Sequence, residues 1–156
     1  MQFGHNDGGP LNDTLRARGT IKGTGEETEE IDNLITNKHE VVHSYGWYIR
    51  KMVREAKEKG AFPDIVTPIP CNDWNEGKII RTPQSYCSWA IEVAHQEKVP
   101  VVDLNKNMSD KLDTFGQEKV TGLYFQSHDH THTTGEGAQL AASLVVKDLK
   151  SVKNAV

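Results

Sequence analysis

Two short apolar runs, separated by a helical pattern, limit most strongly what this chain can fold into. The runs DIVTPIP (64–70) and VPVVDLN (99–105) are typical of strands that are buried on both faces. The helical pattern over 82–98 lies between them, and Thr82 and Pro83 suit its N-cap and first position. Strands that alternate with helices favour a parallel sheet with helices on both faces. We therefore expect a three-layer α/β fold.

Further helices extend this alternation on both sides. Apolar residues recur at spacings of three and four over 40–59, and Gly60 follows where a helix C-terminus favours glycine. A short amphipathic helix is expected to end at Gly116. Its apolar face would consist of Met108, Leu112 and Phe115.

The N-terminal part of the chain carries weaker signals. Residues 1–3 (MQF) resemble the end of a strand, which suggests a sheet that is incomplete on its N-terminal side. Residues 11–38 are polar and without clear periodicity, so a surface loop is expected there. The 156 residues suit one compact domain, and we expect a single partial domain over 1–156.

Charge and composition exclude several classes of partner. The sequence has 18 Lys and Arg residues and 22 Asp and Glu residues, which give a net charge of -4, and no basic stripe appears. Nucleic acid is therefore not the expected partner. No apolar run approaches the length of a membrane span, and no membrane partner is expected. Cys71 and Cys87 can be paired or free. The first residues show no export signal of their own.

Three unusually polar loops should meet at one edge of the expected sheet. They are GHNDGG (4–9), PIPCNDWNEG (68–77) and the stretch that leads into DHTHTT (129–134). In parallel sheets, ligands bind at the carboxyl ends of the strands. The convergence of these loops predicts a binding or catalytic site.

The third loop contains three alternating histidines that allow a metal site. In an extended loop, His128, His130 and His132 would lie on one side and could share an ion. The neighbouring sequence supplies no further ligand spacing. We assign no metal ligand and no cofactor on this pattern alone.

The same loop allows acid–base chemistry. Asp129 and His132 are three residues apart, so one turn brings the carboxylate to the imidazole Nδ1 and leaves Nε2 to accept a proton. The third possibility is a plain exposed loop in front of a helix that begins near Thr134. In that case Thr133 and Glu136 form a capping box and have no chemical role.

The blocks GHND (4–7), TPIPCNDWNEG (67–77) and DHTHT (129–133) resemble the SGNH (GDSL-like) hydrolases, most closely their rhamnogalacturonan acetylesterase branch. The resemblance extends over about residues 2–150 and implies a flavodoxin-like parallel sheet. It also implies that Asn6 is an oxyanion donor, that His132 is the general base, and that Asp129 orients His132. An amide donor in this position would meet the charge that develops on a tetrahedral oxygen.

The chain departs from the family pattern in one important respect. It has no Gly-Asp-Ser block to supply the nucleophile, and it lacks the glycine oxyanion donor that follows the family's second strand. It therefore resembles the C-terminal portion of the domain. The implied function of the parent protein is removal of O-acetyl groups from pectic rhamnogalacturonan through a Ser-His-Asp acyl-enzyme, and this chain alone is expected to be inactive.

The resemblance leaves alternatives and partners to be tested. Other ester or lipid acyl groups could be the substrate, or the chain could be a non-catalytic or metal-binding fragment that uses the three histidines. The implied partner is an acetylated polysaccharide or oligosaccharide. Self-association through an exposed sheet edge is possible, and family members that act on pectin are typically secreted or periplasmic.

Four further residues are candidates for contact with substrate. His5 and Asp7 flank Asn6 and either line the pocket or only hold the turn. Asn72 and Trp74 lie in the second loop, where an exposed indole could stack on a sugar ring. Packing of Trp74 beneath its own loop is the alternative.

Overall fold

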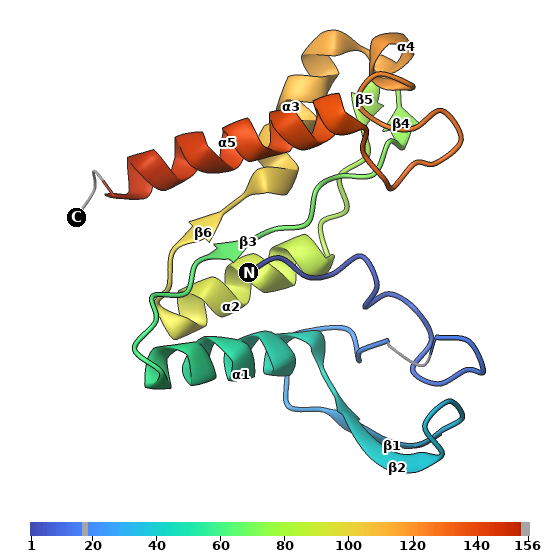
Figure 1. The fold of residues 1–156 in the computed structure, drawn as a ribbon, viewed down its shortest axis with the longest axis vertical. Coiled ribbons are helices and arrows are strands. Elements are labelled where there is room, and N and C mark those ends of the chain that lie inside the picture. Colours follow the sequence, from blue (N-terminus) through green and yellow to red (C-terminus); the bar gives the residue numbers. More distant parts are fainter. Residues whose placement is uncertain (17–18, 154–156) are drawn as a thin grey trace. The chain divides into compact units, whose positions relative to one another are not determined.

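The computed structural model describes residues 1–16 and 19–153, and Figure 1 shows the arrangement of their elements. The elements in chain order are β1 (Thr28–Asn33), β2 (Lys38–His43), α1 (Tyr45–Glu58), β3 (Ile65–Val66), β4 (Trp74–Asn75), β5 (Lys78–Ile79), α2 (Tyr86–Glu97), β6 (Val101–Val102), α3 (Leu104–Phe115), α4 (Gln117–Val120) and α5 (Gly135–Lys153). β3 pairs with β6, and the crossover between them contains α2. This arrangement confirms the expected α/β class.

The chain divides into two compact units. The first comprises residues 1–67 and 84–101, and the second comprises residues 68–83 and those from 102 onward. The expectation of a single domain over 1–156 stays a prediction. No helix of the described residues is both long enough and apolar enough to cross a membrane.

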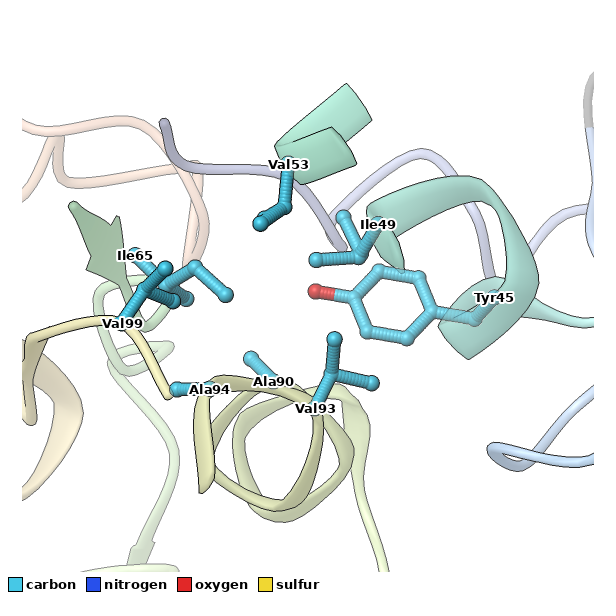
Figure 2. Packing of buried hydrophobic residues seen from close by; sticks show 8 residues of the cluster. All are labelled: Tyr45, Ile49, Val53, Ile65, Ala90, Val93, Ala94 and Val99. Atoms are coloured by element: carbon cyan, nitrogen blue, oxygen red, sulfur yellow. The ribbon is translucent and has the colours of Figure 1, made fainter. Parts of the chain in front are cut away.

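The core of the first unit forms where α1 packs on α2. Tyr45, Ile49 and Val53 recur at a spacing of four on α1 and are almost fully buried. They meet the small buried face of α2, and Figure 2 shows these side chains directed toward one another. That face consists of Ala90, Val93 and Ala94, whose small size allows the two helices to approach closely.

The first helix begins later than its sequence pattern predicts. The pattern starts at residue 40, whereas α1 starts at Tyr45. Ser44 caps the helix by accepting a hydrogen bond from the Trp47 N–H at 3.1 Å. Residues 40–43 belong to β2 instead, because Val42 is buried in the hairpin with β1.

The surface loop expected over 11–38 is wrong for its second half. Thr28–Asn33 form β1, which pairs antiparallel with β2 from Thr28↔His43 to Asn33↔Lys38. A hairpin with one face in solvent needs few apolar residues, and in β1 only Ile31 and Asn33 are buried. Its polar composition therefore concealed the strand. Residues 17–18 of the expected loop lie outside the described part of the chain.

The second helix is also shorter than expected. α2 begins at Tyr86, with Ser85 as its N-cap, so the prediction of Thr82 as N-cap is wrong. The Ser88 hydroxyl accepts a hydrogen bond from the Ser85 N–H at 2.9 Å, which satisfies a backbone donor at the helix start. Residue 98 ends the helix in a left-handed conformation.

The N-terminal residues run beside β3. The Val66 N–H donates to the Met1 carbonyl at 2.8 Å, and the Gln2 side chain donates to the Thr67 carbonyl at 2.9 Å. The segment is thus adjacent to the sheet as the strand-end prediction implied, although residues 1–3 are not assigned as a strand.

The second unit packs a small hairpin and three helices around its own core. The buried hydrophobic residues of this unit are Ile79, Val102, Leu104, Met108, Leu112, Val120 and Phe125. The β4–β5 hairpin is fastened to α3, because the Ile79 N–H and the Arg81 guanidinium both donate to Asp113, at 2.8 and 2.9 Å. α3 is capped by Asp103 and ends at Gly116, as expected.

The start of the last helix differs from the predicted capping box. The hydroxyl of Thr134, and not that of Thr133, accepts the Gly137 N–H at 3.2 Å. Gly137 is buried in the first turn, and a Cβ there would lie 2.0 Å from the Tyr124 carbonyl oxygen. α5 therefore begins close against the segment that precedes the histidine loop.

Truncating a side chain in the α1–α2 core tests this packing. Ile49 is 2% exposed, so Ile49→Ala should lower the free energy of unfolding by about 2–5 kcal/mol. Ile35 is 48% exposed in the β1–β2 turn, and Ile35→Ala should change it by no more than about 0.5 kcal/mol. Urea denaturation followed by circular dichroism measures both. Equal effects of the two substitutions would contradict the assigned core.

Candidate functional site

The histidine loop is folded into a turn and is not extended. The Asp129 N–H donates to the Gln126 carbonyl, and the Gln126 N–H donates to the His132 carbonyl, each at 3.2 Å. Phe125 and Thr133 form an antiparallel bridge at the base of this turn. The loop therefore leaves and rejoins the core of the second unit at almost the same place.

Asp129 organises the turn and contacts His132. One carboxylate oxygen accepts the backbone N–H groups of Thr131, at 2.7 Å, and His132, at 3.0 Å. The other oxygen lies 2.5 Å from His132 Nδ1. The three-residue spacing thus has the effect predicted from the sequence. Because Asp129 engages Nδ1, Nε2 is the ring nitrogen that can exchange a proton with a substrate or nucleophile.

These contacts keep Asp129 ionised. The backbone N–H groups of His132 and Thr131, followed by the His132 ring, lower the pKa of the Asp129 carboxyl from 3.8 to about 2. The side chain of His132 is 74% exposed. The pair thus combines a fixed negative charge with an imidazole that is open to solvent.

A second His–Asp pair joins this loop to the loop after β3. His130 Nδ1 lies 2.9 and 3.0 Å from the two carboxylate oxygens of Asp73. The Asn72 N–H donates to the His130 carbonyl at 2.7 Å. The loops 68–77 and 129–134 therefore meet as predicted, whereas the predicted convergence of the loop 4–9 with them stays a prediction. Sequence spacing could not identify Asp73 as a partner of His130, because the two residues are 57 positions apart.

Asn72 and Trp74 contact each other within the same loop. The Trp74 indole N–H donates to the Asn72 side-chain oxygen at 2.8 Å, and the Asn72 amide donates to the Thr121 hydroxyl at 2.9 Å. Trp74 is half-buried at the start of β4. Both side chains thus hold the loop in place, and their predicted contact with a sugar stays a prediction.

The remaining candidates lie in the first unit, in the turn over residues 5–8. Asn6 and His5 are exposed, and the Asn6 carbonyl accepts the Gly9 N–H at 3.3 Å. The Asp7 carbonyl accepts from the Thr20 N–H at 3.1 Å and from the Tyr86 hydroxyl at 2.9 Å. The backbone of Asp7 is therefore anchored to two other segments. The oxyanion role of Asn6 and the roles of His5 and Asp7 toward a substrate stay predictions.

Asp7 also lines a cavity of about 280 Å³ in the first unit. Partial burial raises the pKa of its carboxyl above the ordinary value. The rest of the lining is mostly apolar or aromatic and includes Phe3, Leu11, Tyr45 and Ile49. The Asp7 carboxyl is therefore easier to protonate than the carboxyl of an exposed aspartate.

The three histidines do not form a ligand group in the described part of the chain. His132 contacts Asp129, whereas His130 contacts Asp73. The one cluster of possible metal ligands found among residues 1–16 and 19–153 consists of Cys71, Asp73 and His130, whose ligand atoms lie within 4.8 Å of one another. The sequence pattern missed this cluster because two of its members come from another loop.

Comparisons with known proteins identify similar sequences, although no known protein-family profile matches the chain. The rhamnogalacturonan acetylesterase of Emericella nidulans is 31% identical over 147 residues, which are 94% of this chain and 58% of that protein. The probable rhamnogalacturonan acetylesterase YesY of Bacillus subtilis is 30% identical over 70% of this chain and 52% of its own length. The chain thus spans somewhat more than half the length of these relatives.

A solved structure supports the fold. The crystal structure of the Bacillus subtilis protein YxiM is 31% identical, with a TM-score of 0.62 over 67% of this chain and 30% of that one. YxiM is described as an uncharacterized esterase. The expected parallel-sheet α/β fold of the SGNH type is thereby confirmed. By sequence, this chain is a homologue of rhamnogalacturonan acetylesterases, and its fold is similar to that of an SGNH-type esterase.

Proposed function

We propose that this chain carries the proton-relay half of an esterase site that removes O-acetyl groups from a pectic polysaccharide. The observation that supports the proposal best is the Asp129–His132 contact, in which a carboxylate with a lowered pKa contacts Nδ1 of an exposed imidazole. Two relatives that are about 30% identical to this chain over the aligned regions are named as rhamnogalacturonan acetylesterases.

The proposed reaction proceeds through an acyl-enzyme. His132 Nε2 accepts the proton of a serine hydroxyl while the serine oxygen bonds to the acetyl carbonyl carbon. The resulting imidazolium returns its proton to the sugar oxygen, and the C–O bond to the sugar breaks. A water molecule then attacks the acyl-enzyme by the same route, releasing acetate and restoring the serine.

Asp129 is suited to stabilise the imidazolium formed in this reaction. Its carboxylate already accepts two backbone N–H groups, so the side chain is preorganised and does not have to reorient when the ring becomes charged. In the same scheme the exposed Asn6 amide would donate a hydrogen bond to the oxyanion. The sequence of this chain contains no Gly-Asp-Ser block. In this proposal, another part of the parent protein supplies the serine.

Loss of the base tests the role of His132. The chain alone should not turn over p-nitrophenyl acetate. Fused behind the N-terminal part of the Emericella nidulans relative, it should release acetate from acetylated rhamnogalacturonan. In that fusion, His132→Ala should lower kcat by at least about 10³-fold, since the serine would lose its base.

His128→Ala is the matched control, because His128 lies in the same loop and has no role in the proposed reaction. It should leave kcat within about twofold. Turnover by the chain alone that disappears with His132→Ala would refute its expected inactivity. Equal loss with both histidine variants would refute the assignment of His132. Faster hydrolysis of other esters than of the acetylated polysaccharide would favour a different acyl substrate.

The ionisation of Asp129 provides a test that needs no substrate. Its folded-state pKa lies below the ordinary value of 3.8, so its contribution to stability is present above that value and is lost as the pH falls toward about 2. A carboxyl carbon titration by NMR should give a midpoint near 2 for Asp129. A midpoint near 4 would show that the backbone N–H contacts do not form in solution.

Asp129→Asn tests whether the carboxylate charge matters to the proposed reaction. An amide can occupy the same space, but it cannot stabilise the imidazolium. In the active fusion, kcat should fall by several orders of magnitude, about 10⁴-fold in a comparable triad. Retention of more than a tenth of the original kcat would rule out Asp129 as the orienting acid.

A further inference from the structure

We propose that Cys71, Asp73 and His130 form a binding site for a zinc-like divalent cation. The cysteine thiol, a carboxylate oxygen and an imidazole nitrogen lie within 4.8 Å of one another. The site shares only His130 with the three-histidine arrangement suggested by the sequence. It is independent of the proposed esterase function.

The backbone holds the two ligand-bearing loops together. The Asn72 N–H donates to the His130 carbonyl at 2.7 Å, directly between the positions of Cys71 and Asp73. On the other side of Asp73, the Ile80 N–H donates to the Asp73 carbonyl at 2.8 Å. These contacts fix the main chain at Asp73 and at His130, so a cation would find its ligands already gathered.

The side chain of Asn72 reinforces this scaffold. Its oxygen accepts the Trp74 indole N–H, and its amide donates to the Thr121 hydroxyl. Asn72 is therefore engaged at its backbone and at both ends of its side-chain amide. These hydrogen bonds restrain the loop that carries Cys71 and Asp73 in its position beside His130.

The mixture of donor atoms indicates which cation fits. Thiolate and imidazole donors favour zinc and other borderline-soft metals, whereas magnesium and calcium prefer sites made of oxygen ligands. Three protein ligands with partial exposure leave a coordination position for water. The side chains of Asp73 and His130 are 48% and 61% exposed, so ions can reach the site from solvent.

Only small movements are needed to reach coordination geometry. In a tetrahedral zinc site, nitrogen and oxygen ligands lie roughly 3.3 Å apart, given metal–ligand distances of about 2.0–2.2 Å. His130 Nδ1 and the nearest Asp73 oxygen are 2.9 Å apart, so this pair would open slightly. No two ligand atoms in the cluster are more than 4.8 Å apart, so a sulfur–nitrogen pair, near 3.6 Å in such sites, would close by at most roughly 1.2 Å.

The electrostatics of the cluster also favour a cation. Partial burial, followed by the negative charge of Asp73, raises the pKa of the Cys71 thiol, and Asp129 adds to this effect. The same carboxylates attract a divalent ion, which would displace the thiol proton on binding.

Cobalt titration of the purified chain tests the site. Co²⁺ bound by a cysteine produces a thiolate-to-metal charge-transfer absorption, and Zn²⁺ should abolish it by displacement. We expect saturation at one equivalent. Cys71→Ser should eliminate this absorption, and Asp73→Asn and His130→Gln should each weaken binding by at least about tenfold.

Two matched variants serve as controls. Cys87→Ser retains Cys71 and should keep the full charge-transfer absorption. His128→Gln alters a histidine of the same loop and should leave the affinity within about twofold. Loss of the absorption in Cys87→Ser, or weakening in His128→Gln equal to that in His130→Gln, would overturn the proposed ligand set. Absence of the absorption in the unaltered chain would overturn the site itself.

A second measurement avoids substitutions that could impair folding. Alkylation of the unaltered chain by iodoacetamide, mapped by mass spectrometry, should slow at least about tenfold at Cys71 when Zn²⁺ is present. Cys87 should react at an unchanged rate. Equal rates at Cys71 with and without Zn²⁺ would contradict metal binding through its sulfur.

Discussion

The hydrogen bond from the Asn72 N–H to the His130 carbonyl holds together the two loops on which the site in the second unit depends. One loop carries Cys71 and Asp73, and the other carries both candidate histidines. A backbone contact of 2.7 Å sets the register between them, so the side chains on either side meet in fixed pairs. The Asp73–His130 pair and the Cys71 cluster both follow from this register.

The two histidines occupy different environments because they alternate along a tight turn. His132 contacts an aspartate of its own loop, whose charge is fixed by backbone N–H groups. His130 contacts an aspartate of the neighbouring loop, beside a half-buried thiol. Nδ1 contacts a carboxylate in both pairs, but the His130 pair also lies beside the Cys71 sulfur. His130 is placed among groups that can share a metal ion.

The homology of the chain restricts how these pairs are interpreted. The relatives are esterases, and two of them are named as rhamnogalacturonan acetylesterases. Since the chain spans 58% of the first of these relatives, the complete reaction remains our proposal for the whole protein. The Asp129–His132 pair supports that proposal through its geometry.

The sequence by itself determined the features that arise from local spacing. The alternation of apolar runs and helical patterns indicated an α/β fold, because each element must bury its own apolar face. The three-residue spacing of Asp129 and His132 indicated their contact, since a single turn brings them together. Gly116 marked a helix end, where its φ of 82° suits glycine.

Only the tertiary structure decided the features that depend on distant segments. β1 was missed because a solvent-facing strand is mostly polar, and it becomes recognisable only through its pairing with β2. The N-cap of α2 is Ser85 and not the predicted Thr82, although both residue types suit that position. Asp73 and His130 are 57 positions apart in the sequence, and they meet because a backbone hydrogen bond brings their two loops together. Residue spacing cannot predict such a contact.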